Sequence, residues 1–216
     1  MSFAAIIVAS GSSRRMGFDK LAAPIDGKPV LWHSVRAFSS LVEISQVIVV
    51  APPERFEWLA DLGEKLSRVD GGKERADSVA AGLSALDQNI THVAIHDGAR
   101  PMVSADSIMA TFRAAHASGA ASVARKVTET LKRATPDGIT TESVSREDLW
   151  IMETPQIFSK DLITEAYQKV KAGDADITDE VSALQLLGHG TTLVENHSPN
   201  PKITVQSDLE NLPPRI

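Results

Sequence analysis

Short apolar runs alternate with longer segments of helical periodicity along this chain. The apolar runs are rich in Ala, Ile and Val, and their continuous hydrophobicity is typical of strands that are buried on both faces. Between the runs, apolar residues return every three or four positions, as in Leu31, Val35 and Phe38, which favours amphipathic helices. The predicted strands cover residues 4–9, 45–51, 91–97, 121–127 and 191–197, and the predicted helices cover residues 29–41, 74–86, 104–119, 159–173 and 178–188.

This alternation predicts an α/β fold with a Rossmann-like, mostly parallel sheet and helices on both faces. In such sheets, ligands bind beyond the carboxyl ends of the strands. The loop after the first strand and the loop after residues 91–97 both lie at such ends, so we expect them to meet at one edge of the sheet. A last extended piece at 201–205 precedes a short acidic turn.

Residues 126–149 break the alternation. They form two Thr-rich extended stretches around Thr135-Pro136-Asp137-Gly138, a sequence that is typical of a turn. We therefore expect a protruding β-hairpin arm here. An isolated two-stranded ribbon is barely stable in water, so the arm needs support, and we expect a second copy of the chain to supply it.

The composition sets limits on partners and location. The length of 216 residues allows a sizeable core, and we expect one domain over residues 1–216. The formal net charge of −6 argues against nucleic acid or an anionic membrane as a partner. The chain has no Cys, which excludes disulfides and thiol chemistry, and no apolar stretch approaches the ~20 residues of a membrane span. We therefore expect a cytoplasmic protein.

Small residues followed by cations distinguish the loop after the first strand. Gly11, Ser12 and Ser13 would let backbone N–H groups approach an anion, and Arg15 and Lys20 would neutralise it. Gly and Ser are also common in ordinary turns, and Arg and Lys are common on surfaces. The position at a strand end favours a cradle for a triphosphate. The sequence has neither a Walker loop nor the GxGxxG motif of dinucleotide-binding proteins.

A carboxylate stands at the end of the strand at 91–97. Asp97 is followed by two small residues and then by Arg100, which precedes a proline. The carboxylate could simply cap a turn. Beside a polyphosphate cradle it would instead hold Mg²⁺, because this ion takes only one or two protein carboxylates and fills its other positions with water and phosphate. His96 points to the other side of the strand, which predicts a packed histidine rather than a catalyst.

Three further stretches carry candidate binding residues. Gly72 and Ser78 lie around a predicted helix start, where main-chain amides and a hydroxyl could recognise a base. Thr178 lies at another predicted helix start, where it or the next residue would cap the helix, and it could also bind a hydroxyl or a phosphate. Lys202 follows Pro201 on what we expect to be a short strand. By default it would be an ordinary solvated lysine.

Taken together, these stretches resemble the 2-C-methyl-D-erythritol 4-phosphate cytidylyltransferases of the nonmevalonate isoprenoid pathway. The resemblance covers nearly the whole chain, and the stretches that carry it are IIVASGSSRRMG, GGKERADSV, HDGARP, ETLKRA, TPQIF, ITDEVSAL and NPKITV. It implies a single α/β nucleotidyltransferase domain and a homodimer that exchanges the hairpin arm. It also implies that CTP and 2-C-methyl-D-erythritol 4-phosphate react to give 4-diphosphocytidyl-2-C-methyl-D-erythritol and pyrophosphate, with Mg²⁺ as cofactor.

The same resemblance implies roles for individual residues. Arg15 and Lys20 would grip the triphosphate, with Lys202 assisting. Asp97 would lie beside Mg²⁺ and the hydroxyls of the substrate. The other implied contacts are Ala9, Ser10, Gly11, Gly72 and Ser78 with the nucleotide, Arg100, Thr154 and Thr178 with the sugar phosphate, and Thr130 and Arg146 with the sugar phosphate from the partner's arm.

Two other functions stay open on the sequence. A sister activity would transfer the same group to ribitol 5-phosphate or another polyol phosphate, and only acceptor contacts such as Arg146 would differ. The chain could instead be a regulatory module that binds a nucleotide without catalysis. Binding alone would not need Arg15, Lys20, Asp97 and Lys202 together, which favours an enzyme. The cations would let two mutually repelling anions meet, and no covalent nucleophile is needed.

Overall fold

A seven-stranded sheet forms the centre of the computed structural model, which describes residues 2–11, 17–173 and 177–213. The strand order is β11-β7-β10-β6-β1-β4-β5. β1 pairs in parallel with β4 and β6, β4 with β5, and β7 with β11, so the predicted mostly parallel sheet is confirmed. The bounds are β1 (Phe3–Val8), β4 (Ile44–Val50), β5 (Leu66–Val69), β6 (His92–Asp97), β7 (Ala120–Lys126), β10 (Trp150–Ser159) and β11 (Thr192–Glu195).

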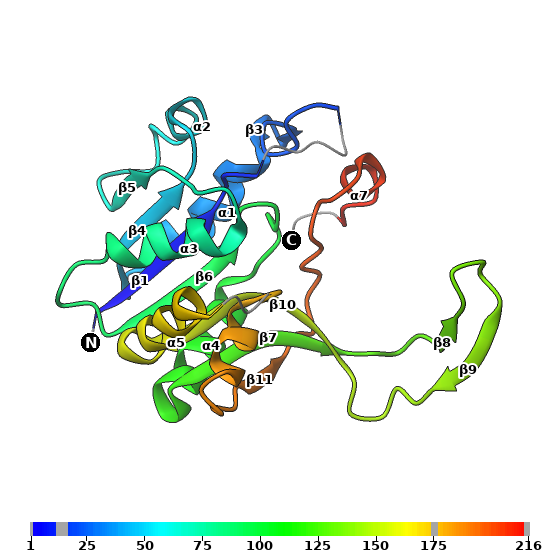
Figure 1. Ribbon diagram of the computed structural model, residues 1–216. Coiled ribbons are helices and arrows are strands. Elements are labelled where there is room, and N and C mark those ends of the chain that lie inside the picture. The colour runs from blue at the N-terminus through cyan, green and yellow to red at the C-terminus, as the bar shows by residue number, and fades with distance from the viewer. Residues whose placement is uncertain (1, 12–16, 174–176, 214–216) are drawn as a thin grey trace.

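Helices cover both faces of this sheet (Figure 1). The side chains of β1 alternate between the faces, so that Ala5 and Ile7 join one core while Ala4 and Ile6 join the other. The first core contains α1 (Val30–Ser39) and α4 (Ala105–Ser118), and the second contains α3 (Arg75–Ser84), α5 (Lys160–Ala172) and α6 (Glu180–Gln185). The remaining described elements outside the arm are β2 (Pro24–Ile25), β3 (Lys28–Pro29), α2 (Pro53–Glu57) and α7 (Gln206–Glu210).

β10 is a strand that the sequence pattern did not predict. We expected the chain to pass from the arm directly into the helix at 159–173, but β10 pairs antiparallel with both β6 and β7. Glu153, Thr154 and Gln156 interrupt the apolar pattern that identifies a buried strand, although all three are buried. The expectation was wrong because these polar groups find hydrogen-bond partners inside the fold.

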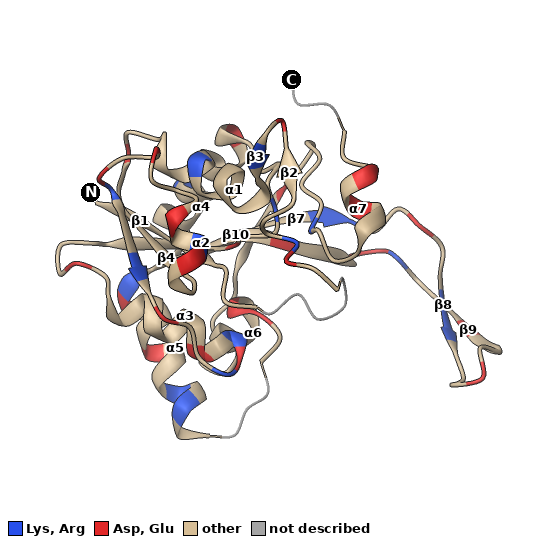
Figure 2. Cartoon of the chain, turned by 90° about the horizontal axis from the view of Figure 1, so that it is seen from above, with Lys and Arg blue, Asp and Glu red and all other residues tan. Residues whose placement is uncertain are grey.

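Residues 126–149 form the expected hairpin arm. β8 (Leu131–Ala134) and β9 (Thr140–Val144) pair antiparallel as a separate sheet, and Gly138 in the turn between them has φ +82°. The arm extends away from the body in two perpendicular views (Figures 1 and 2). Most of its residues are exposed, including Ile139 at 67%. The body of its own chain therefore gives the arm little to pack against.

The chain after β11 returns to the carboxyl edge of the sheet. Residues 201–204 form neither helix nor strand, so the short strand predicted to carry Lys202 is wrong. The N–H of Ile203 donates to the carbonyl of Ala99 at 2.9 Å, which places this stretch beside the loop after β6. Over the described ranges, no helix combines the length and the apolar character that crossing a membrane requires.

Candidate active site

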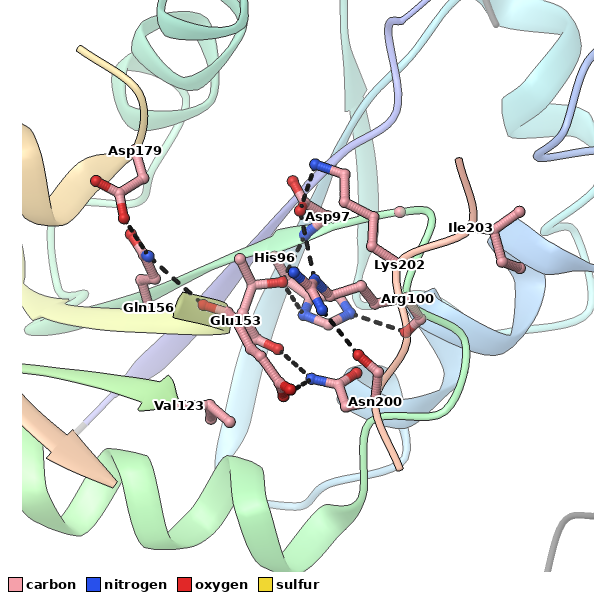
Figure 3. A network of polar contacts seen from close by, with 12 residues as sticks. His96, Asp97, Arg100, Val123, Glu153, Gln156, Asp179, Asn200, Lys202 and Ile203 are labelled. Atoms are coloured by element: carbon pink, nitrogen blue, oxygen red, sulfur yellow. Dashed lines mark hydrogen bonds and ion pairs between the residues drawn. The ribbon is translucent and has the colours of Figure 1, made fainter. Parts of the chain in front are cut away.

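Asp97 closes β6 and lies at the centre of a cluster of cations. Its carboxylate is 2.9 Å from Lys202 Nζ and 3.5 Å from the Nε atoms of Arg75 and Arg100. Figure 3 shows Lys202 reaching toward Asp97 from the C-terminal stretch. Burial would raise the pKa of Asp97, but the three cations outweigh burial and hold this pKa well below its ordinary value. The carboxylate is therefore ionised, and positive charge predominates around it.

Arg75, at the start of α3, is the cation of this cluster that the sequence analysis missed. Its two terminal nitrogens donate to the carboxylate of Glu180 in α6, at 2.5 and 2.9 Å, and the hydroxyl of Tyr167 donates to the same carboxylate at 2.9 Å. Burial would lower the pKa of Arg75, but Glu180 and Asp97 raise it above its ordinary value. A Glu on the apolar face of a predicted helix was the available signal, because a fully buried carboxylate needs a cationic partner.

Lys20 contacts the C-terminal stretch that carries Lys202. Lys20 Nζ donates to the carbonyl of Ile203 at 2.7 Å, and Ile203 is the residue after Lys202. The side chain of Lys202 is 41% exposed, so it is open to a ligand. Both lysines therefore contact or belong to the same C-terminal stretch, while their catalytic roles stay predictions. Arg15, the third predicted cation, lies outside the described residues.

A second cluster of polar contacts lies around Ser78, which is buried in α3. Its Oγ is 2.8 Å from the Oγ of Ser10 and accepts a hydrogen bond from the N–H of Gly72 at 3.2 Å. The approach of the two loops requires Gly71, because a Cβ at that position would stand 2.3 Å from the Cβ of Ser10. The structure thus brings together three of the residues predicted to bind the nucleotide.

Arg55 of α2 holds the start of the loop after β1. It donates to the carbonyls of Ala9 and Gly11, and its Nε is 2.7 Å from the carboxylate of Asp19. The N–H of Ala9 donates to the carbonyl of Val50 at 2.9 Å. Both backbone groups of Ala9 are therefore engaged within the protein. The contacts of Ala9 and Gly11 with a nucleotide stay predictions.

His96 and Thr154 form a buried chain of hydrogen bonds behind Asp97. The N–H of Asp97 donates to Thr154 Oγ1 at 3.1 Å, and this oxygen is 3.0 Å from His96 Nδ1. His96 Nε2 lies 3.1 Å from the carbonyl of Arg100, which can only accept, so the ring proton is assigned to Nε2. His96 is fully buried, which confirms the predicted packed histidine, and this burial lowers its pKa to about 4. Thr154 orients Asp97, and its contact with a substrate stays a prediction.

The remaining predicted contacts lie at different distances from the cluster. Arg100 is part of it. Thr178 is exposed near the start of α6, where Asp179, and not Thr178, caps the helix by accepting from the N–H of Ser182 at 2.9 Å. Thr130 and Arg146 are exposed on the arm, which extends away from the body (Figure 1). Within one chain, the structure does not bring these two residues to Asp97.

The fit of Mg²⁺ to this edge depends on Asp97. Among the described residues, no group of three His, Cys, Asp or Glu side chains could hold a metal ion. One carboxylate at a strand end still fits an ion that takes its other ligands from phosphate and water. Because cations outnumber carboxylates around Asp97, the ion would enter together with a polyphosphate.

A cationic sheet edge that continues into a small-residue loop suits the phosphates of a nucleotide. The class that the fold and this edge define is the α/β nucleotidyltransferases. The sequence profile of the 2-C-methyl-D-erythritol 4-phosphate cytidylyltransferases matches residues 3–212, and the chain belongs to this family. The resemblance seen in the motifs is thereby confirmed.

Relatives and solved structures agree with this assignment. A 2-C-methyl-D-erythritol 4-phosphate cytidylyltransferase of Caldanaerobacter subterraneus subsp. tengcongensis is 38% identical over 97% of this chain and 96% of its own length. The crystal structure of 4-diphosphocytidyl-2C-methyl-D-erythritol synthase from Anaerococcus prevotii matches with a TM-score of 0.84 and 28% identity, covering 96% of this chain and 94% of that one. The crystal structure of the cytidylyltransferase from Thermus thermophilus matches with a TM-score of 0.82 and 30% identity, covering 97% and 96%.

Proposed function

We propose that this chain joins CTP and 2-C-methyl-D-erythritol 4-phosphate to give 4-diphosphocytidyl-2-C-methyl-D-erythritol and pyrophosphate, a step of nonmevalonate isoprenoid biosynthesis. The observation that carries the proposal is that Lys202 lies 2.9 Å from Asp97 at the carboxyl edge of the sheet, while Lys20 donates to the carbonyl of the next residue, Ile203. Membership of the family favours this reaction over transfer to ribitol 5-phosphate or another polyol phosphate. It also favours an enzyme over a module that only binds a nucleotide.

The difficulty of this reaction is electrostatic. A phosphate oxygen of the acceptor attacks the α-phosphorus of CTP, and the bond from that phosphorus to the bridging oxygen breaks as pyrophosphate leaves with the electron pair. The acceptor phosphate is already ionised at neutral pH, so no covalent nucleophile is required. Lys20 and Arg15 would stabilise the charge on the triphosphate, and Lys202 would assist by neutralising the reacting phosphates.

The other binding residues divide between the nucleotide and the sugar phosphate that accepts the cytidylyl group. Ser10, Gly72 and Ser78 would recognise the nucleotide, largely through backbone groups, and the hydrogen bonds between them hold their two loops together. Arg100 and Thr178 would complete the acceptor pocket. Mg²⁺ would be the cofactor, bound to phosphate oxygens near Asp97, and it would neutralise charge that develops on the triphosphate.

A homodimer would complete the site with the arm of the second chain. Thr130 and Arg146 are exposed on that arm and would reach the sugar phosphate of the partner's site. The exposure of Ile139 on the arm supports a contact with another chain. A cytoplasmic location stays a prediction of the sequence.

Replacing Lys20 tests the catalytic proposal. We expect Lys20→Ala to lower kcat about 100-fold or more in a pyrophosphate-release assay, because it removes a charge that acts on the reacting phosphates. Lys65→Ala is the matched control. Lys65 also donates to backbone carbonyls, those of Ser39 and Leu41, but at the opposite end of the sheet, so its loss should leave kcat unchanged.

The choice of substrates separates the candidate functions. The same assay over several nucleotides and polyol phosphates, with and without Mg²⁺, should give turnover with CTP, 2-C-methyl-D-erythritol 4-phosphate and Mg²⁺. Higher kcat/KM with ribitol 5-phosphate would favour the sister activity. Nucleotide binding without any pyrophosphate release would favour the regulatory module.

A further inference from the structure

Lys202 is carried by a segment that no regular structure holds. Residues 196–204 include neither helix nor strand. Pro199 and Pro201 flank Asn200, and neither proline has an N–H to donate, so the backbone here cannot make a regular ladder of hydrogen bonds. The position of Lys202 must therefore be fixed in another way.

Among the described residues, backbone hydrogen bonds to the rest of the fold hold only the ends of this segment. The N–H of Asn196 donates to the carbonyl of Ala124 at 2.8 Å, and the N–H of Ile203 donates to the carbonyl of Ala99 at 2.9 Å. Between these two bonds, the described contacts with the rest of the fold involve side chains, and they centre on Asn200.

Glu153 of β10 anchors the middle of the segment. Its Oε2 accepts from the Nδ2 of Asn200 at 3.0 Å and from the Nδ2 of Asn196 at 2.9 Å. The same amide of Asn200 donates to the carbonyl of Thr154 at 2.8 Å. Figure 3 shows Asn200 between Glu153 and Arg100, whose Nη1 donates to the Asn200 carbonyl at 2.7 Å. One carboxylate thus ties two asparagines of the segment to the sheet.

The burial of these polar groups costs free energy that a role in packing alone would not require. Glu153 and Asn200 are both 5% exposed, and the desolvation of a buried carboxylate costs free energy that pairing only partly repays. The cation nearest to Glu153 among its described contacts is Arg125, with its Nε at 3.7 Å. The Oδ1 of Asn200 is buried and has no hydrogen-bond partner in the described part of the chain. Apolar side chains would avoid both costs, which indicates that the pair serves the site.

We propose that Glu153 is a positioning residue for Lys202, acting through Asn196 and Asn200. The inference rests on the role proposed above for Lys202. Because Pro201 restricts the backbone between Asn200 and Lys202, a shift of Asn200 carries the lysine with it. Lys202 Nζ now stands 2.9 Å from Asp97, and moving a catalytic group by about 1 Å can cost roughly 100-fold in rate.

Pyrophosphate release by the full-length enzyme tests the proposal. We expect Glu153→Ala and Asn200→Ala each to lower kcat about tenfold or more, with a smaller change in the KM for CTP. Glu153→Gln keeps an acceptor oxygen for the asparagines and should recover most of the lost rate. In a Lys202→Ala background, Glu153→Ala should have almost no further effect, because both changes act on the same group.

Gln46→Ala is the matched structural control. Gln46 donates to the carbonyl of Ala85 at 3.2 Å and accepts from the N–H of Asp87 at 3.0 Å, at the opposite end of the sheet, so its loss should leave kcat unchanged. Hydrogen exchange at the N–H of Ile203 should be faster in Glu153→Ala than in wild type or Gln46→Ala.

The two proposals can fail separately. If Lys202→Ala alone keeps the wild-type kcat, the role proposed for Lys202 is wrong, and the positioning role loses its target. If Lys202→Ala is impaired but Glu153→Ala lowers kcat by the same factor with and without Lys202, only the positioning role is overturned. Unchanged exchange at Ile203 in Glu153→Ala would also overturn it.

Discussion

His96 is buried in its neutral form behind Asp97, and a titration can detect this burial. Its pKa is lowered to about 4 in the folded chain, against an ordinary value of 6.5. Between these values the unfolded chain binds a proton that the folded chain does not, so the free energy of unfolding falls as the pH falls from about 6.5 to about 4. The loss from His96 is about 3 kcal/mol at most. Asp97 adds a further loss as the pH falls through the ordinary pKa of a carboxyl and below it, because its pKa is lowered in the folded chain.

Denaturant titrations between these pH values measure the slope. His96→Gln should make the free energy of unfolding less dependent on pH, whatever its effect on stability at neutral pH. His92→Gln is the control. Burial also lowers the pKa of His92, but its side chain is less buried than that of His96. Equal slopes in wild type and His96→Gln would contradict the assignment.

Single residues of the site differ in how far the sequence reveals them. Lys20 and Asp97 could be proposed from the sequence, because Asp97 ends a buried strand and Lys20 lies in the loop after another, a loop that begins with small residues. Arg75 and Glu180 could not be paired, because they are 105 positions apart and the sequence shows that a residue is charged but not which charge lies opposite. In the sequence, Glu153 is a polar residue that interrupts an apolar pattern, and only the fold shows that its carboxylate accepts a hydrogen bond from Asn200.

At the scale of elements, the short helix α2 supports the loop after β1 through one side chain. Arg55 connects the carbonyls of Ala9 and Gly11 to the carboxylate of Asp19, the residue before Lys20. We expect Arg55→Met to raise the KM for CTP about tenfold, because both ends of the loop lose their shared anchor. The KM from pyrophosphate release and the Kd of CTP from calorimetry measure the effect.

Arg68→Met is the matched control for α2. Arg68 of β5 donates to the carbonyl of Ala51 at 3.0 Å and to Asp70 at 2.6 Å, so it makes the same kind of contact at the end of the neighbouring strand β4. Its removal should leave the KM for CTP within about twofold of wild type. A similar rise in both variants would mean that the effect is one of general stability.

The elements that could be predicted are those with a strong periodic signal. β1, β4, β6 and β7 have continuous apolar runs, and the helices that flank them show one apolar face. α2 has five residues, of which the first is Pro53, too few to show a period. β10 mixes buried polar residues with apolar residues, so its sequence lacks the pattern of a buried strand. Only its pairing with β6 and β7 identifies it as a strand of the sheet.

At the scale of the whole molecule, the hairpin arm separates two groups of predicted site residues. Lys20 and Lys202 lie at the sheet edge, while Thr130 and Arg146 lie on an arm that extends away from the body (Figure 1). The sequence predicted this arm from its turn and its lack of apolar residues. It could not predict how one chain meets another, because that depends on surfaces that are distant in sequence.

Mixing two inactive variants tests whether the arm works in the partner's site. In an arm-exchanged dimer of Lys20→Ala with Arg146→Ala, one site carries both substitutions, and the other combines an intact Lys20 with an intact Arg146 from the second chain. Each variant alone should be strongly impaired, but an equimolar mixture that has exchanged subunits should regain roughly a quarter of the wild-type kcat. Lys65→Ala mixed with Arg146→Ala controls for the effect of mixing. If the arm served its own chain, each polypeptide in the first mixture would stay defective, and no activity would return, because neither chain has both residues intact.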